Sequence, residues 1–421
     1  MILITINYIQ ILFVNKPTAA SIEAYEKFTP GICAELHNQK EELKGYSIFH
    51  INSTANGGGI AELLRSQVPL ERSLGIDSRW FAMTAPADFF RVTKKIHNLL
   101  QGARHDPLSE EDIRTYRDIN RALGHELGEL MRECPADVVF IHDPQPLFAA
   151  EYIHSSIPFI LRVHIDLSRP DPDTLELLRA SVLRYRAVVF SHPSFIPPWL
   201  TAPDASRIIM PAIDPFTDKN RTLGDSPALA ASAGIDMGKP RIAQVSRFDQ
   251  WKDPIGVIEA YLHARESIFG LQLVLAGSHA GDDPEGVLVY EAARRFAGGD
   301  PRIIFYTEQN DVIINAIRTE SDIIVQKSIR EGFGLTVTEA MWKEKAVIGG
   351  DTAGIRSQIA DGENGFIVSS PSDAAAAIVR LWEDNSLRQK IGKRARETVL
   401  ASYLMPRYIR DHIAFYQDVI R

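Results

Sequence analysis

Two glutamates flank a glycine turn in the segment REGFGLTVTEA, residues 330–340. We expect Glu331 at the end of a strand, near a reacting sugar, with the N–H groups of the next helix start open to a diphosphate. Glu339, two turns further on, is expected to turn inward and accept hydrogen bonds from ribose hydroxyls. An ordinary exposed glutamate is the alternative, which the apolar and small residues around Glu339 disfavour. The residues predicted to contact the nucleotide here are Gly332, Phe333, Gly334, Leu335, Thr336 and Glu339.

Two cations lie close together in SRFDQWKDP, residues 246–254, directly after a predicted strand. Arg247 can form a bidentate fork and Lys252 a point charge, so the pair can neutralise a diphosphate leaving group. Taken alone, this segment fits a solvated basic loop equally well.

A run of three glycines separates a predicted strand from a predicted helix in NSTANGGGI, residues 52–60. Glycine permits close backbone approach, and a helix N-terminus favours negative charge, so Gly58 and Gly59 are predicted to contact a phosphate or a sugar. The alternative is a tight turn that binds nothing. The run is not the G-x-G-x-x-G fingerprint, which argues against a dinucleotide-binding dehydrogenase.

Polar residues follow two further predicted strands. Asp143 and Gln145 come after the strand of residues 137–142, and His164 and Asp166 lie at the end of the strand of residues 159–165. A lone histidine at a strand end is more often structural than catalytic. A polar cluster at this place is better explained by sugar hydroxyls, which need donors and acceptors. All four residues are predicted to bind substrate, and His164 is also predicted to be catalytic.

A possible metal motif, Asp171-Pro172-Asp173, has a simpler explanation. The D-x-D form holds Mn²⁺ in some transferases, but here it stands at a helix start, where Asp is a favoured N-cap. Since Arg247 and Lys252 can neutralise a diphosphate, no metal ligand is assigned.

Short β-branched runs alternate with helical patterns along most of the chain, which predicts doubly wound α/β domains. The first series of predicted strands covers residues 46–52, 137–142, 159–165 and 187–192, and the second covers residues 241–246, 271–277, 302–306, 322–326 and 345–350. Residues 211–240 are rich in Pro, Asp, Asn, Ser, Ala and Gly and are predicted to be a linker. Ligands of such sheets bind at the carboxyl ends of the strands, so we expect the two domains to face each other across a cleft.

The composition bounds the class of protein. The chain has 421 residues with a formal net charge of −8, which argues against non-specific nucleic-acid binding. The apolar residues 1–14 are too short to span a bilayer and lack a basic leading region, so a strand or a surface helix is expected and no stable membrane insertion. Cys33 and Cys134 fit neither a metal spacing nor a disulfide framework, and we expect a cytoplasmic protein.

These motifs resemble the family-four retaining glycosyltransferases of the GT-B fold. The resemblance is closer to the trehalose glycosyltransferring synthases and covers residues 45–420. It rests on the strings HINSTANGGGIAELL, KKIHNLLQG, HDPQP, VHIDLSRP, PAIDPFTDKN, QVSRFDQWKD and QKSIREGFGLTVTEAMW. Those enzymes join the glucose of an NDP-glucose to free glucose, giving α,α-trehalose.

The resemblance implies a role for each matching position. Arg247 and Lys252 match the pair on the donor diphosphate, Glu331 the acidic residue at the donor glucose and Glu339 the one on the ribose. Arg247, Lys252 and Glu331 are accordingly predicted to be catalytic. Gly58 and Gly59 match the loop over the reacting centre, and Asp143 and His164 match residues on the glucosyl groups.

The resemblance also implies a division of the chain and a set of ligands. Residues 1–215 would form the acceptor-side domain, onto which a helix of residues 405–421 packs back, and residues 216–404 would bind the nucleotide sugar. The donor would be UDP- or ADP-glucose, the acceptor a small sugar, and no cofactor would be required. A homodimer is compatible with this interpretation.

Four competing interpretations remain. One is another family-four transferase, building a polysaccharide or a glycolipid with the same donor residues. Phosphorolysis of trehalose is less favoured because the related phosphorylases are longer chains. A nucleotide-sugar-binding protein without catalysis and an NAD-dependent dehydrogenase complete the set.

Overall fold

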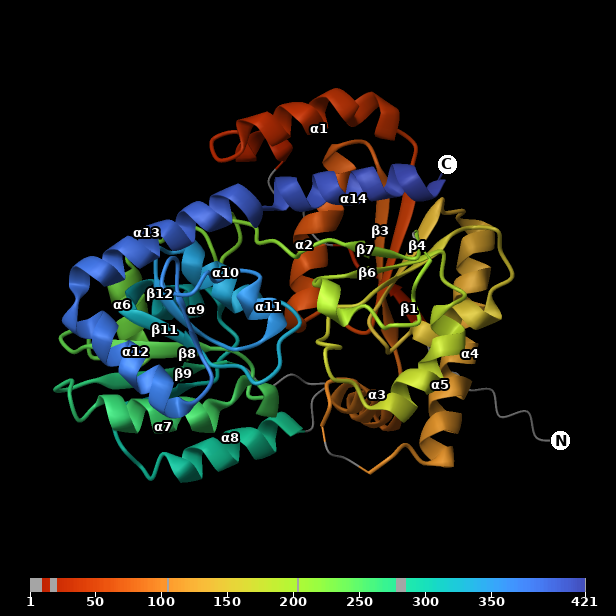
Figure 1. Ribbon diagram of the computed structural model, residues 1–421. Coiled ribbons are helices and arrows are strands. Elements are labelled where there is room, and N and C mark those ends of the chain that lie inside the picture. Colours follow the sequence, from red (N-terminus) through yellow and green to blue (C-terminus); the bar gives the residue numbers. More distant parts are fainter. Residues whose placement is uncertain (1–9, 16–20, 104–105, 203, 278–284, 421) are drawn as a thin grey trace. The chain divides into compact units, whose positions relative to one another are not determined.

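The computed structural model describes residues 10–15, 21–103, 106–202, 204–277 and 285–420 (Figure 1). The chain divides into two compact units. The first comprises Met1–Pro211 and Met405–Arg421, and the second comprises Ala212–Leu404. The C-terminal segment therefore belongs to the first unit, although the whole second unit precedes it in the sequence.

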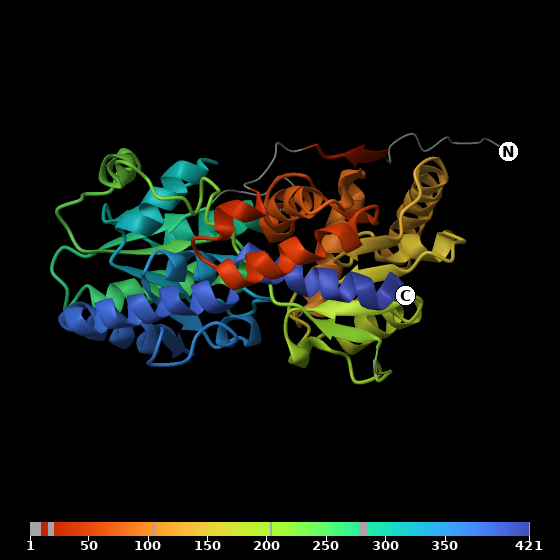
Figure 2. The same ribbon diagram turned by 90° about the horizontal axis from the view of Figure 1, so that it is seen from above.

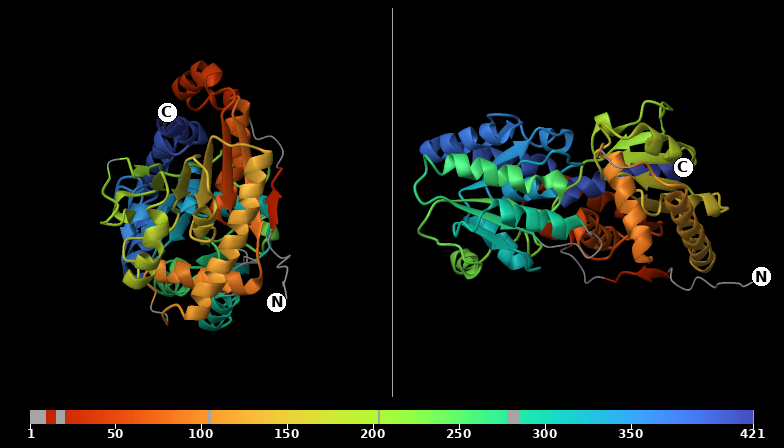
Figure 3. Two further views of the ribbon diagram at one scale, coloured as in Figure 1. Left: turned by 90° about the vertical axis from the view of Figure 1, so that its right-hand side faces the viewer. Right: turned by 90° about the horizontal axis from the view of Figure 1, so that it is seen from below.

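The first unit is built on a seven-stranded sheet in the order β1-β3-β2-β4-β5-β6-β7. Its strands are β1 (Gln10–Phe13), β2 (Ser47–Asn52), β3 (Asp77–Thr84), β4 (Val138–His142), β5 (Phe159–Arg162), β6 (Ala187–Phe190) and β7 (Ser206–Ile208). The edge strand β1 runs antiparallel to β3, and the other pairs are parallel (Figure 3). Strands β4, β5 and β6 are buried along their whole length, as expected for the middle of a parallel sheet with covered faces.

The helices of the first unit include several that begin at residues favouring helix starts. They are η1 (Ile22–Tyr25), α1 (Pro30–Leu43), α2 (Gly58–Ser73), α3 (Ala87–Leu100), α4 (Glu110–Glu133), η2 (Leu147–Tyr152), α5 (Pro172–Val182), η3 (Pro193–Phe195) and α14 (Met405–Ile420). Ser109 and Asp112 form a capping box at the start of α4. Helix α14 lies beside α1 (Figure 2) and buries one face, including Tyr408, His412 and Tyr416.

The second unit is built on a six-stranded parallel sheet in the order β10-β9-β8-β11-β12-β13. Its strands are β8 (Arg241–Val245), β9 (Gln272–Ala276), β10 (Ile303–Tyr306), β11 (Ile323–Gln326), β12 (Ala346–Gly350) and β13 (Phe366–Val368). Its helices are α6 (Ser226–Ser232), η4 (Gln250–Lys252), α7 (Pro254–Ala264), α8 (Glu285–Phe296), α9 (Asp311–Glu320), α10 (Leu335–Trp342), α11 (Ala353–Arg356), α12 (Pro371–Glu383) and α13 (Asn385–Ser402). Aliphatic side chains of β8, β9, β11 and β12 pack with those of α7 and α12 in one core.

The sequence predicted the buried strands and overlooked several others. The predicted strands of both series are present, whereas β3, β7 and β13 were not expected. Strand β3 reads DSRWFAMT, in which Thr84 is the one β-branched residue, whereas the prediction relied on runs of such residues. Of the apolar residues 1–14, for which a strand or a surface helix was predicted, residues 10–13 form β1 and residues 1–9 lie outside the described part of the chain.

The segment of residues 211–240 is more than the linker that the sequence predicted. It contains α6, which packs on α9. Asn315 Nδ2 donates to the carbonyls of Asp218, at 2.7 Å, and Arg221, at 2.9 Å, which ties the loop to α9. The first unit ends at Pro211, four residues before the predicted boundary, because the N–H of Ile213 already bonds to Tyr403 O within the second unit.

No helix among the described residues combines the length and the apolar character needed to cross a membrane.

Candidate active site

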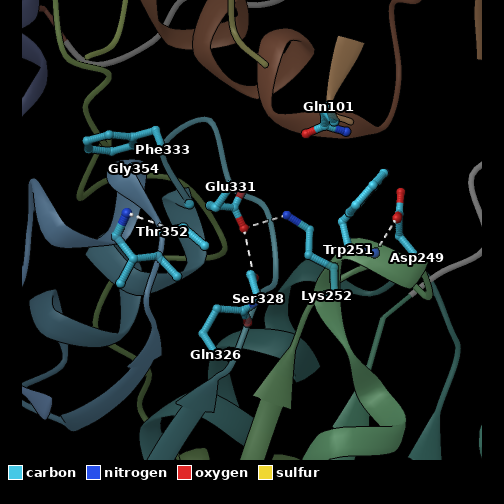
Figure 4. Close-up of polar contacts among 12 residues, drawn as sticks. Gln101, Asp249, Trp251, Lys252, Gln326, Ser328, Glu331, Phe333, Thr352 and Gly354 are labelled. Carbon is cyan, nitrogen blue, oxygen red and sulfur yellow. Dashed lines mark hydrogen bonds and ion pairs between the residues drawn. The ribbon is translucent and has the colours of Figure 1, made fainter. Parts of the chain in front are cut away.

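Lys252 and Glu331 meet in the second unit. Lys252 Nζ donates to Glu331 Oε2 at 2.5 Å, and Ser328 Oγ donates to the same oxygen at 3.1 Å (Figure 4). The Glu331 side chain is buried, so this charge-assisted bond lies where water screens it little. The structure thus brings together the predicted cation and the predicted carboxylate. Ser328, which precedes the glycine turn by a few residues, was not predicted.

The loop that carries Lys252 is fixed from both sides. Gln244 Nε2, on β8, donates to Lys252 O at 2.6 Å, and the Asp249 carboxylate accepts from the N–H of Trp251 at 2.9 Å. The N–H of Ile329 donates to Trp251 O at 2.8 Å, which joins this loop to the one that follows β11. Lys252 is therefore held by backbone contacts on the same loops that carry its partner.

Glycines let the backbone close around Glu331. Gly334 has φ +89°, and a Cβ there would lie 3.1 Å from Glu331 Cγ. A Cβ at Gly354 would lie 2.5 Å from Glu331 O, and one at Gly350 would lie 2.1 Å from Ser328 O. A side chain at any of these positions would displace the buried carboxylate or the backbone beside it.

The N-terminus of α10 fits an anion. Gly334 is the N-cap and offers no side chain to satisfy the first N–H groups. Gly334, Leu335 and Thr336 are half-buried, whereas Gly332, Phe333 and the rest of α10 are buried. The accessible part of this helix is therefore its positive end, which is where a phosphate group would be stabilised.

Arg247 follows β8 and is half-buried. Within the described part of the chain, its guanidinium has no hydrogen-bonding partner. This contrasts with Lys252, which is already engaged with Glu331. An unpaired guanidinium retains its donors for a bidentate contact with two oxygens of an anion such as a phosphate.

Glu339 is buried and paired. Arg318 Nη2, on α9, donates to Glu339 Oε2 at 2.5 Å, and both side chains are almost fully buried. The predicted inward orientation of Glu339 is therefore present, with an arginine partner that the sequence analysis did not foresee. Arg318 directly follows Ala316 and Ile317, which are buried in α9, and this position in the sequence could have indicated a buried arginine.

A second ion pair of the same loops was also missed. Lys327 and Asp253 are in contact, with Lys327 Nζ donating to Asp253 Oδ2. Asp253 has φ 50° and caps α7 by accepting from the N–H of Gly256 at 3.0 Å. This pair fixes the start of α7 directly after Lys252.

In the first unit, Asp143 and His164 lie together at the ends of β4 and β5. The N–H of His164 donates to Asp143 Oδ1 at 2.7 Å, and His142 Nδ1 lies 3.0 Å from His164 Nε2. Asp143 is buried at φ 63°, a conformation that non-glycine residues rarely adopt. Burial raises the pKa of Asp143 to about 7, although the His164 N–H and Arg162 oppose the rise. Burial and the neighbouring charge of Arg162 hold the pKa of His164 well below its ordinary value.

The other two predicted sugar-binding residues have local contacts. Asp166 is buried, and its Oδ1 accepts from the N–H of Ser168 at 2.8 Å, which closes a turn. The backbone carbonyl of Gln145 accepts from Asn120 Nδ2 at 3.0 Å. Gln145 Oε1 is buried and has no hydrogen-bonding partner in the ranges that the structure describes.

The glycine loop of the first unit needs glycine for its conformation. Gly57 and Gly58 have φ 74° and 78°, and α2 begins at Gly58. A Cβ at Gly58 would meet no atom within 4 Å, and Gly59 is exposed. The loop is anchored at Asn52, whose Oδ1 accepts from Trp80 Nε1 at 2.8 Å.

Asp171 is an N-cap, as predicted. Its Oδ1 accepts from the N–H of Thr174 at 2.8 Å at the start of α5, while Asp173 is exposed in the first turn. The described residues include no group of three or more His, Cys, Asp or Glu side chains that could hold a metal ion.

The chain matches two protein families, one in each unit. Residues 50–197 match the family described as trehalose synthase, N-terminal domain, and residues 225–398 match glycosyl transferases group 1. The fold also agrees with that of a solved structure. An α,α-trehalose-phosphate synthase (UDP-forming) from Burkholderia vietnamiensis superposes with a TM-score of 0.69 at 14% identity, over 90% of this chain and 98% of that one. The fold is therefore the GT-B fold of glycosyltransferases.

Two relatives are similar over nearly their whole length. A trehalose synthase from Rubrobacter xylanophilus is 39% identical over 92% of this chain and 94% of that protein. A trehalose synthase from Pyrococcus horikoshii is 41% identical over 92% of each. This chain belongs to the trehalose synthase family of glycosyltransferases.

Proposed function

We propose that this protein transfers glucose from UDP- or ADP-glucose to free glucose, with retention of configuration, to give α,α-trehalose. The observation that carries the proposal is the contact of Lys252 with buried Glu331 beside the uncapped N-terminus of α10. This arrangement combines a cation, a carboxylate and free N–H groups, which are the groups that a nucleotide sugar requires. The two trehalose synthases support the choice of product.

The donor is assigned to the second unit. Arg247, Lys252 and the N–H groups from Gly334 to Thr336 would neutralise the diphosphate as it leaves. Glu331 would accept hydrogen bonds from hydroxyls of the donor glucose. The ion pair with Arg318 would hold the Glu339 carboxylate in place, so that it can accept hydrogen bonds from the ribose hydroxyls.

The sugar contacts of the first unit are assigned to Asp143, His164, Gln145 and Asp166, with Gly58 and Gly59 in the loop over the reacting sugar. Asp143 and His164 are coupled through the His164 N–H, so one residue orients the other. Gln145 Oε1, buried and without a partner in the described ranges, is an acceptor that a sugar hydroxyl would satisfy.

The reaction would proceed by attack of the acceptor hydroxyl on the same face from which the diphosphate departs. The contribution of the protein is then orientation and charge stabilisation. Glu331 already accepts from Lys252 and Ser328, which suits a binding carboxylate better than a nucleophile. No metal or further cofactor is needed in this scheme.

Acceptor-dependent release of the nucleotide tests the proposal. The protein is incubated with UDP-, ADP- or GDP-glucose, alone and with glucose, a longer glucan or a lipid-linked sugar. Release of UDP or ADP that requires free glucose is expected. Release only with a glucan or lipid acceptor would instead support a transferase that builds a polysaccharide or a glycolipid.

Two further outcomes would indicate a different class of protein. Formation of glucose 1-phosphate from trehalose and inorganic phosphate, without use of a nucleotide sugar, would indicate a phosphorylase. Tight binding of UDP-glucose without turnover on any acceptor would indicate a binding protein.

A further inference from the structure

A line of polar side chains crosses the interior of the first unit from α2 to the end of β5. His50 Nε2 lies 3.3 Å from Glu71 Oε2, and His50 Nδ1 lies 3.2 Å from His142 Nε2. His142 Nδ1 lies 3.0 Å from His164 Nε2. Glu71, His50 and His142 are buried, whereas His164 is half-buried. The line thus connects a carboxylate in the core to the histidine that we assign to sugar binding.

The carboxylate at the inner end accepts hydrogen bonds from three neutral donors, which favours its ionised form. Ser78 Oγ and Tyr416 Oη each donate to Glu71 at 2.5 Å, and Gln67 Nε2 donates at 2.8 Å. An ionised carboxylate only accepts, so the His50 nitrogen that faces it must carry a hydrogen.

The direction of every following bond is then determined if each ring carries one proton. A neutral imidazole has one donor and one acceptor nitrogen. With hydrogen on His50 Nε2, His50 Nδ1 accepts from His142 Nε2. His142 Nδ1 therefore accepts from His164 Nε2. The remaining nitrogen, His164 Nδ1, is left without a hydrogen.

We infer that Glu71, His50 and His142 are positioning residues that fix the tautomer of His164, so that His164 Nδ1 accepts a hydrogen bond from a sugar hydroxyl. The part of this inference that concerns the sugar rests on the proposed function, and the part that concerns the tautomer does not. His164 Nδ1 has no hydrogen-bonding partner among the residues of the described ranges, and the ring is half-buried. It is therefore the acceptor end of the line.

Neutral rings are favoured at two of the three positions. Burial and the neighbouring histidines and Arg162 hold the pKa of His142 well below its ordinary value, and burial and Arg162 do the same for His164. A second proton on His50 would reverse both following bonds and place a hydrogen on His164 Nδ1. The presence or absence of a hydrogen on His164 Nδ1 therefore depends on the protonation of every ring in the line.

The test is ¹⁵N NMR of the full-length protein labelled at histidine, without substrate, with His164 assigned from the variant H164Q. An unprotonated Nδ1 and a protonated Nε2 at His164 are expected near neutral pH. A protonated Nδ1 would overturn the inference.

Two variants test the cause. In E71Q the side-chain amide can donate to His50 Nε2, so a hydrogen is expected to appear on His164 Nδ1. Y416F is the matched control, because it removes one bond to the same carboxylate and leaves the His50–Glu71 contact in place. In Y416F, His164 should have the same tautomer as in the wild-type protein. An unchanged tautomer in E71Q, or the same change in both variants, would contradict the inference.

A third variant covers the case that E71Q does not fold. H142F keeps a ring at position 142 but has no nitrogen, so it interrupts the line. His164 should then show both tautomers, and a single unprotonated Nδ1 as in the unchanged protein would contradict the inference.

Activity separates this inference from the proposed function. For trehalose formation, kcat/KM is expected to fall about tenfold or more in E71Q, the equivalent of one lost hydrogen bond. The change in Y416F should stay within about twofold. If the unchanged protein forms no trehalose, the proposed function fails while the tautomer measurement still stands. Equal kcat/KM in E71Q and Y416F, with trehalose formed, would contradict the sugar contact of His164.

Discussion

Arg247 and Lys252 are two cations on one loop with different surroundings. Lys252 is bound to buried Glu331, whereas the Arg247 guanidinium has no hydrogen-bonding partner within the described ranges. Removing Lys252 takes away the cation that compensates the charge of the buried Glu331 carboxylate, and this loss lowers the stability of the fold. Removing Arg247 leaves no such group behind. The two residues therefore differ in their structural role, although both are assigned to the diphosphate.

We predict that R247A and K252A each lower the rate about 10²–10³-fold, the usual effect of removing one group that stabilises developing charge. Only K252A should also lower the free energy of unfolding, by roughly 1–3 kcal/mol. Steady-state kinetics and denaturant unfolding measure both effects. The control is K393A, on the exposed side of α13, which should change neither. Full activity in R247A or K252A would show that the loop is an ordinary solvated surface.

Asp143 makes stability depend on pH. Its pKa is raised from 3.8 to about 7 by burial, so between these values the folded state keeps a proton that the unfolded state has lost. The contribution of Asp143 to the free energy of unfolding therefore decreases as the pH rises through this range, and it is constant at higher pH.

The isosteric variant D143N cannot ionise and should not show this fall. Relative to the unchanged protein, D143N should gain stability from about pH 5 to about pH 8, as measured by urea unfolding. A stability difference that does not change with pH would contradict the raised pKa of Asp143.

At the scale of elements, α10 depends on a glycine at its start. Gly334 has φ +89°, and a Cβ there would lie 3.1 Å from Glu331 Cγ. Gly362 offers a matched comparison, with φ +74° and no atom within 4 Å of a Cβ. Both glycines adopt a left-handed conformation, but only Gly334 touches the candidate site.

We predict that G334A and G362A each lose about 1–2 kcal/mol of stability because alanine is strained in this conformation, and that G334A loses more because its Cβ also displaces the buried Glu331. Only G334A should raise the KM for the nucleotide sugar, by about tenfold or more, since its Cβ displaces Glu331. Thermal unfolding and donor kinetics provide the two readings. If G362A impaired donor binding as much as G334A, strain alone would explain the effect.

Elements with strong local patterns were predictable, and those without them were not. Strands such as β4 and β11 are short, β-branched and buried on both faces, so their sequence alone marks them. Strand β3 carries few β-branched residues, and α6 lies in a segment rich in loop-forming residues. Strand β3 forms by pairing with β2, and α6 forms by packing on α9. No local sequence pattern indicates either contact.

The same limit applies to the candidate site. The motif spacing predicted Lys252, Glu331, Asp143 and His164, because each follows a strand. It could not predict the pair of Arg318 with Glu339, whose members lie on separate helices. The contacts of Glu71 likewise join α2, β2, β3 and α14, from opposite ends of the chain.

At the scale of the whole molecule, we predict that the proposed reaction proceeds without a metal ion. Asp171 is used as the cap of α5, and the positive end of α10 with Arg247 and Lys252 can balance the diphosphate. We predict that protein treated with EDTA and assayed in metal-free buffer keeps nearly its full rate. A loss of activity that Mn²⁺ or Mg²⁺ restores would contradict this prediction and return the D-x-D segment to consideration.

The configuration of the disaccharide product tests the central claim most directly. The protein is supplied with α-UDP-glucose or α-ADP-glucose, carrying ¹³C at the anomeric carbon, and unlabelled glucose, and the product is identified by NMR. A non-reducing disaccharide with one labelled and one unlabelled anomeric carbon, both in α configuration, is the predicted result. A β configuration at the labelled carbon, or a reducing disaccharide, would contradict retaining transfer to the anomeric hydroxyl of glucose.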